Sequence, residues 1–195
     1  MHPYTVVDLD QRSPLWLQWR LEGIGASDAP TIMGESPYRS RQALLREKTC
    51  GECEPENGYM SRGVALEPVA RRHYERLVGV RVKPVCLQST AYGWLRASLD
   101  GLSTDGSRVV EIKCGQAAYR LAATTGQPPG YYVGQLQHIL AVTGLPEIDF
   151  VCYLPGRPVV HLPVPRDEGY IRSLLAAERE FWALVLRERA PAALH

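Results

Sequence analysis

The stretch Ser98-Leu99-Asp100-Gly101, followed after a short turn by Val109-Val110-Glu111-Ile112-Lys113, decides which fold and which chemistry to expect. Both stretches are short runs rich in strand-forming residues. Side chains two residues apart on a strand point to the same face. Glu111 and Lys113 should therefore project together, while the residue between them packs the other way.

The two stretches are joined by a hairpin signal, the dipeptide Asp105-Gly106. This turn should bring Asp100 close to Glu111. Carboxylate oxygens suit Mg²⁺ and Mn²⁺, and two such ions about 4 Å apart could promote phosphodiester hydrolysis while Lys113 orients or deprotonates the water. Spacing alone leaves an alternative open, in which Asp100-Gly101 is a turn and Glu111 and Lys113 form an exposed surface pair.

Apolar periodicity around this hairpin predicts alternating helices and strands. Helices are expected at about 14–22, 29–33, 41–48, 61–78, 131–142 and 167–189, and strands at 80–87, 94–99, 108–113, 148–154 and 159–164. Ser27-Asp28 is expected to cap the second helix, and 51–58 to form a loop. The fold class is therefore α/β, with a central mixed sheet and helices on both faces. One domain should span residues 1–195, with its core at about 13–165.

Composition is that of an ordinary globular protein, with 45% apolar and 22% charged residues. No stretch reaches the roughly 18 apolar residues of a membrane span, and the start lacks signal-peptide order, so a cytoplasmic location is expected. The five cysteines should be reduced. Cys50 and Cys53 form a CxxC pair, but a second pair that would complete a metal site is missing from the sequence.

A formal net charge of +1 does not by itself indicate a nucleic-acid-binding protein. Basic residues are nevertheless concentrated in the segments 39–48 and 62–83. They could form a solvated helix face or a basic rim around an acidic metal site, and the charge pattern leaves both interpretations open.

Several sequence blocks together resemble the YqaJ and lambda exonuclease branch of the PD-(D/E)XK nuclease superfamily. In the order that this family has, they are Trp16–Arg20 with Gly23–Asp28, Arg62–Glu67, Ser98–Gly101, Glu111–Cys114 and Tyr131–Gln137. The blocks cover roughly residues 13 to 155, which makes the match more specific than the short catalytic motif. The chain departs from the pattern at Leu99, where the signature has proline, and at Gly115, where proline is common.

The resemblance implies roles for individual residues. The residues that would hold a metal are Asp100, Glu111, Glu67 and the backbone carbonyl of Ile112. The catalytic residues would be Asp100, Glu111, Lys113, Gln135 and Glu67. DNA phosphate would be bound by Arg20, Ser27 and Ser98. Without the resemblance, Glu67 would be a solvated helical acid, and Arg20 and Ser27 a structural arginine and a helix cap. The same reasoning leaves Gln137, His73 and His138 without catalytic roles.

The function implied is a Mg²⁺-dependent exonuclease, with Mn²⁺ as an alternative ion, that digests linear double-stranded DNA from 5′ to 3′. The resemblance also implies double-stranded DNA ends as substrate, a single-strand annealing protein as partner, a homotrimer, and recombination of the phage type in a bacterial host cell. Three alternatives remain: an endonuclease, a Cas4-like repair nuclease with an iron–sulfur cluster, and a catalytically idle DNA-binding module. Cas4-like proteins need four cluster cysteines flanking the core, and only Cys152 follows Cys114.

Overall fold

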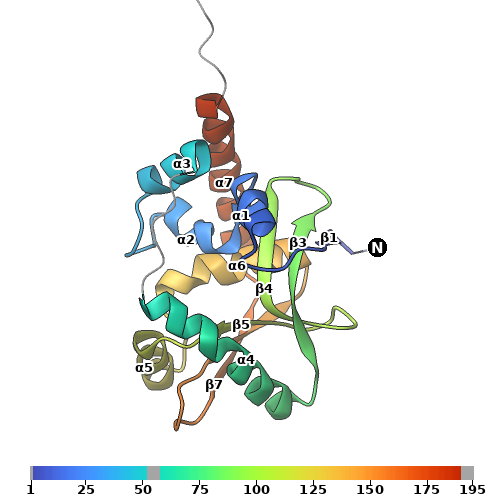
Figure 1. Ribbon diagram of the computed structural model, residues 1–195, viewed down its shortest axis with the longest axis vertical. Coiled ribbons are helices and arrows are strands. Elements are labelled where there is room, and N and C mark those ends of the chain that lie inside the picture. Colours follow the sequence, from blue (N-terminus) through green and yellow to red (C-terminus); the bar gives the residue numbers. More distant parts are fainter. Residues whose placement is uncertain (1, 52–57, 190–195) are drawn as a thin grey trace, which may run out of the picture.

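The computed structural model describes residues 2–51 and 58–189, except for the side chains of 58–61. Within these ranges its centre is a seven-stranded sheet in the order β1-β3-β4-β5-β6-β7, with β2 paired to β4 (Figure 1). The strands are β1 (Tyr4–Val7), β2 (Ile24–Gly25), β3 (Val82–Ser89), β4 (Leu95–Ser103), β5 (Val109–Lys113), β6 (Glu147–Cys152) and β7 (Val160–Pro165). The sheet is mixed, because β5 and β6 are parallel while β4 and β5 are antiparallel.

Several helices begin or end at residues whose local chemistry favours a helix end. They are α1 (Pro14–Leu21), α2 (Ala29–Ile32), α3 (Arg41–Cys50), α4 (Gly58–Val78), α5 (Gln116–Thr125), α6 (Val133–Thr143) and α7 (Glu168–Arg189), with 3₁₀ turns η1 (Ala26–Asp28) and η2 (Gly130–Tyr132). The Ser13 hydroxyl caps α1 by accepting the Trp16 amide at 3.2 Å. Gly51, Gly126 and Gly144 end three helices with positive φ. Among the described helices, none is long and apolar enough to cross a membrane.

Strands β4 and β5 pair only briefly before they separate. Their ladder joins Gly101 to Val110 and Leu102 to Val109. Beyond it, β5 continues beside β6, and the parallel connection between those two strands is made through α5 and α6. If the β4–β5 register continued by one residue, Asp100 would stand opposite Glu111. The two carboxylates thus lie where the strands part.

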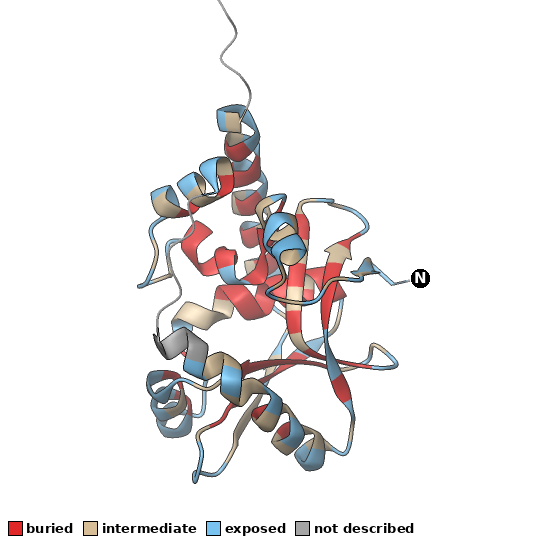
Figure 2. Cartoon of the chain, in the orientation of Figure 1, coloured by how far each residue is buried: buried red, intermediate tan, exposed pale blue. Residues whose placement is uncertain are grey.

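Apolar residues on both faces of the sheet are covered by helices (Figure 2). One core cluster joins α6 to the sheet through Leu136, Ile139, Leu140, Leu99 and Phe150, among others. A second lies under α4 and includes Ala70, Tyr74, Val110, Ile112 and Val151. Helix α6 is deeply enclosed, with nine of its eleven residues buried. The sheet and these two helices surround the point where β4 and β5 separate.

The predicted α/β class with a central mixed sheet is confirmed, but Asp100-Gly101 is not a turn. Strand β4 passes through both residues to Ser103. A Cβ at position 101 would lie 2.6 Å from Val82 Cγ2 and 2.7 Å from Val110 Cγ1. Glycine therefore serves close packing between three strands here.

Three elements were missing from the prediction: β1, β2 and α5. Strand β1 is an edge strand held by backbone pairing with β3, and its two central residues are exposed. Helix α5 buries only Ala118 and Ala122. Strand β1 is only four residues long, and the residues that α5 buries are alanines, which are a weak signal in the sequence.

Asp28 stands at the N-cap position of α2, as expected, but its side chain does not cap the helix. The Ser27 hydroxyl accepts from Arg20 instead, and the Asp28 carboxylate is buried against Arg39 and Lys48. Buried ion pairing has taken the carboxylate that a helix cap would have used. The expected loop at 51–58 lies mostly outside the described residues, and α4 begins at Gly58 rather than near 61.

Candidate active site

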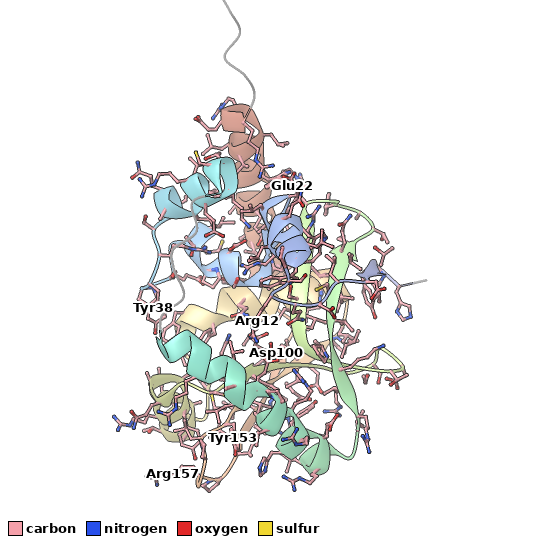
Figure 3. The ribbon with its side chains drawn as sticks, in the orientation of Figure 1. Arg12, Glu22, Tyr38, Asp100, Tyr153 and Arg157 are labelled. Atoms are coloured by element: carbon pink, nitrogen blue, oxygen red, sulfur yellow. The ribbon has the colours of Figure 1, made fainter. Side chains whose placement is uncertain are left out.

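Asp100 lies where β4 leaves β5, between α4 and α6 (Figure 3). Its Oδ2 accepts a hydrogen bond from the Ile112 amide at 2.7 Å. This bond connects β4 to β5 just beyond the last residue pair of their ladder. Burial, together with the charges of Glu111 and Glu67, raises the pKa of Asp100 well above its ordinary value, and Lys113 offsets this only in part. The site therefore concentrates negative charge in a poorly solvated place.

Glu111, Lys113 and Gln135 form a closed triangle of contacts. Lys113 Nζ lies 2.7 Å from Glu111 Oε1 and donates to Gln135 Oε1 at 3.1 Å. Gln135 Nε2 in turn donates to Glu111 Oε1 at 2.7 Å. Lys113 Nζ also lies 4.6 Å from the centre of the Tyr132 ring. The carboxamide from α6 thus orients both charged groups of β5.

Lys113 is held in its charged form. Burial alone would lower the pKa of its ammonium, but the charges of Glu111 and Asp100 and the hydrogen bond to Glu111 raise it above its ordinary value. A charged ammonium donates hydrogen bonds and cannot accept a proton. Lys113 is therefore suited to orienting a water or a phosphate oxygen.

Glu67 on α4 joins the site through an arginine that the sequence prediction missed. Arg71 Nη2 contacts Glu67 Oε1 at 2.5 Å, and Arg71 Nε donates to the Asp100 carbonyl at 2.7 Å. Arg12 also reaches Glu67, at 3.4 Å from Oε2. The spacing of Glu67 and Arg71, four residues apart on a helix, was a signal that could have indicated this pair.

The three residues predicted to bind phosphate are connected through Trp16. Arg20 Nη2 donates to Ser27 Oγ at 2.9 Å, and the Arg20 guanidinium lies 4.9 Å from the centre of the Trp16 ring. The indole N–H of Trp16 donates to Ser98 Oγ at 2.7 Å. The structure therefore brings Arg20, Ser27 and Ser98 into one chain of contacts on the α1 side of β4. Sequence reasoning assigned no role to Trp16.

Residues expected to be non-catalytic have contacts within the fold. Gln137 Nε2 donates to the Pro165 carbonyl, and its Oε1 accepts the Asp167 amide. His138 is buried, with Nδ1 2.6 Å from Glu178 Oε1. These contacts connect α6 to α7 and to the segment before it.

The donor set suits a hard divalent cation. The carboxylates of Asp100, Glu111 and Glu67 interact electrostatically here, and Glu111 Oε2 is buried without a hydrogen-bond partner in the described structure. Within residues 2–51 and 58–189, no three His, Cys, Asp or Glu side chains are grouped so that they could hold a metal ion by themselves. An ion here would keep water or substrate oxygens among its ligands, as Mg²⁺ usually does. Cys50 is exposed, whereas Cys53 lies outside the described residues.

The model of the YqaJ-like viral recombinase domain matches residues 15–146, a range that includes every predicted site residue. The chain belongs to this family. Among curated relatives, the protein YqaJ of Bacillus subtilis (strain 168) is 32% identical over 188 residues, which cover 91% of this chain and 58% of that protein. A protein of Acanthamoeba polyphaga mimivirus is 29% identical over 164 residues, covering 75% of this chain and 29% of its own length. This YqaJ-like chain thus spans little more than half of the first relative.

Solved structures show the same fold. The alkaline exonuclease LHK-Exo from Laribacter hongkongensis superposes with a TM-score of 0.80 at 28% identity, covering 91% of this chain and 94% of that one. The same enzyme has been crystallised in complex with dAMP. A phage-related exonuclease from Haemophilus somnus 129PT has a TM-score of 0.62 at 13% identity, covering 86% and 96%. The YqaJ-like chain therefore has the PD-(D/E)XK fold.

Proposed function

We propose that this chain is a metal-dependent deoxyribonuclease, specifically an exonuclease that digests linear double-stranded DNA from the 5′ end. The observation that carries the proposal is the grouping of Asp100, Glu111 and Lys113, held by Gln135, at the point where β4 and β5 separate. Support comes from the likeness along 91% of the chain to a protein described as an alkaline exonuclease.

Each group has a role in phosphodiester hydrolysis. Asp100, Glu111, Glu67 and the Ile112 carbonyl would hold Mg²⁺ or Mn²⁺, with two ions per site. Bound metal supplies neutralisation of charge on the phosphate and an activated water. Lys113 positions that water or a phosphate oxygen through its ammonium, and Gln135 fixes the lysine. The burial of Glu111 excludes bulk water and strengthens these interactions.

The proposed direction of digestion, from the 5′ end, is based on the contacts that Arg20 makes with Ser27 and Trp16 at α1. A planar guanidinium suits bidentate binding of a terminal phosphate, and Arg20 is oriented for this by Ser27 and Trp16. Ser98 offers a hydroxyl two residues before Asp100 on the same strand. The dAMP bound by LHK-Exo is a mononucleotide of the kind that exonucleases release.

We extend the proposal to the assembly and the partner of this protein. The chain would form a homotrimer, and a single-strand annealing protein would receive the exposed strand during phage-type recombination.

The test is digestion of linear duplex DNA labelled separately at its 5′ and 3′ ends, with and without a 5′ phosphate, beside a closed circle. Reactions contain Mg²⁺, Mn²⁺ or EDTA, with wild-type protein and Lys113→Ala. Loss of the 5′-ended strand from linear DNA alone, dependent on metal and on Lys113, is the expected result. Cutting of the circle would establish an endonuclease instead.

Two further outcomes address the remaining alternatives. Absence of cleavage with every metal, but retained DNA binding, would establish an idle binding module. A brown protein whose colour is lost on oxidation would favour the iron–sulfur nuclease.

A further inference from the structure

Arg12 has an unusual backbone conformation beside the proposed catalytic site. Its φ is 73°, and it is the one non-glycine residue with positive φ in the described part of the chain. The Ser13 amide donates to the Asp10 carbonyl at 3.1 Å, which places Arg12 third in a four-residue turn. Glycine is the ordinary residue where that turn position has positive φ, because a side chain is strained there.

The chain on both sides keeps Arg12 in this conformation. Before it, Gln11 Nε2 donates to the Leu99 carbonyl at 2.9 Å, so the turn is attached to β4 immediately beside Asp100. After it, Ser13 caps α1. These two contacts determine where the Arg12 side chain leaves the backbone. That point lies beside Asp100, at the edge of the proposed catalytic site (Figure 3).

Stability does not explain an arginine at this position. Its one ion pair within the described structure is the 3.4 Å contact with Glu67, and 45% of the Arg12 side chain is exposed. Glu67 already has a much shorter contact with Arg71. An exposed ion pair contributes little to folding, whereas a strained conformation has a cost. Strain retained beside a catalytic site indicates a role in function.

We propose that Arg12 is a substrate-binding residue whose guanidinium binds a backbone phosphate of the DNA strand at the mouth of the catalytic site. This inference rests on the proposed nuclease function and adds a contact to it. A guanidinium binds phosphate oxygens bidentately. Arg12 precedes α1 and Arg20 lies near its end, so the two arginines would contact different phosphates along that helix. The exposed side chain is free to leave Glu67 for a phosphate.

The test uses Arg12→Gly, which removes the side chain and suits the backbone. For linear duplex DNA we expect KM to rise about tenfold with kcat nearly unchanged, as for a lost charged hydrogen bond. In the Lys113→Ala background, which separates binding from cleavage, the slope of log affinity against log salt should fall by about one. The melting temperature should stay the same or rise.

Arg157→Gly is the matched control, because it removes the same charge from an exposed turn far from Asp100 (Figure 3). It should change neither KM nor the salt slope. Arg12→Lys should recover part of the lost affinity, since it restores the charge without the bidentate geometry. Unchanged KM and salt slope in Arg12→Gly, or a lower melting temperature with normal binding, would overturn the proposal. If the wild-type protein cleaves nothing, the nuclease function fails, while the binding measurement still decides whether Arg12 contacts DNA.

Discussion

At the scale of single residues, the site depends on short polar contacts between side chains from different elements. Gln135 connects Glu111 and Lys113, although it is 24 residues from one and 22 from the other. A carboxamide can do this because it donates from nitrogen and accepts at oxygen. A hydrophobic replacement would leave both charged groups without that restraint.

Gln135→Leu should lower kcat about 10- to 100-fold, the usual effect of losing a group that orients catalytic residues. Steady-state digestion of a labelled linear duplex measures it. The control is Gln137→Leu on the same helix, which removes contacts with Pro165 and Asp167. That variant should lose about 1–3 kcal/mol of stability with kcat retained. Equal kcat values in the two variants would count against the role of Gln135.

Gly101→Ala should destabilise the protein by about 1–3 kcal/mol, because overpacking displaces neighbouring side chains. Its Cβ would meet Val82 and Val110 well inside van der Waals distance. Urea denaturation gives the change in the free energy of unfolding. Gly63→Ala is the opposite control: a Cβ there meets nothing within 4 Å, and alanine favours a helix interior. A stability loss in Gly63→Ala as large as in Gly101→Ala would contradict the packing explanation.

At the scale of elements, α6 and α7 are joined by the buried pair of His138 and Glu178. The Nε2 of His138 lies 2.8 Å from the Arg96 carbonyl, and its Nδ1 lies 2.6 Å from Glu178 Oε1. Both ring nitrogens face acceptors, so the doubly protonated ring satisfies them. Burial alone would lower the pKa of His138, but Glu178 and these hydrogen bonds raise it.

This pair makes stability depend on pH. The pKa of His138 in the folded protein lies above its unfolded value of about 6.5. The stabilisation that charged His138 gives to the folded state is therefore fully present below that pH. It is lost as pH rises through the raised pKa. Glu178→Gln should remove most of this loss, so its stability should vary less from pH 6 upward than that of the wild type. Denaturation curves across that range provide the measurement, and identical pH slopes for both proteins would refute the assignment.

At the scale of the whole molecule, a buried ionic network connects α3 and α7 to Arg20, one of the residues predicted to bind phosphate. Lys48 Nζ lies 2.7 Å from Asp28 Oδ2, and Arg20 and Arg39 approach the other oxygen. Burial alone would raise the pKa of Asp28, but these cations hold it well below its ordinary value. Arg189, at the end of α7, donates to the Lys48 carbonyl. The packing of α3 and α7 thereby supports the position of Arg20 (Figure 1).

Lys48→Met should cost about 3–5 kcal/mol of stability, because it leaves Asp28 with less compensation in a buried place. The double variant with Asp28→Asn should lose less than the sum of the two single changes. Chemical denaturation of the three variants tests this. Strict additivity would show that the two side chains do not act as a pair.

Local rules were sufficient for a large part of the fold and of the candidate site. The same-face spacing of Glu111 and Lys113 and the hairpin at Asp105-Gly106 predicted which groups would meet, and helix periodicity predicted α4, α6 and α7. The contacts of Trp16 and Tyr132, and the bond from Arg71 to the Asp100 carbonyl, escaped prediction because each depends on packing between distant segments. The catalytic, metal-binding and phosphate-binding roles themselves stay predictions.

The sequence by itself determined most of the element types, the family, and the order of the acidic and basic groups, since these depend on the chain's local sequence. Only the tertiary structure decided that Asp100 remains within a strand, that α6 supplies Gln135 to both charges of β5, and that Arg12 reaches Glu67. The physical reason is that strand divergence and burial set the solvation and partners of each side chain. Neither can be read from residues adjacent in sequence.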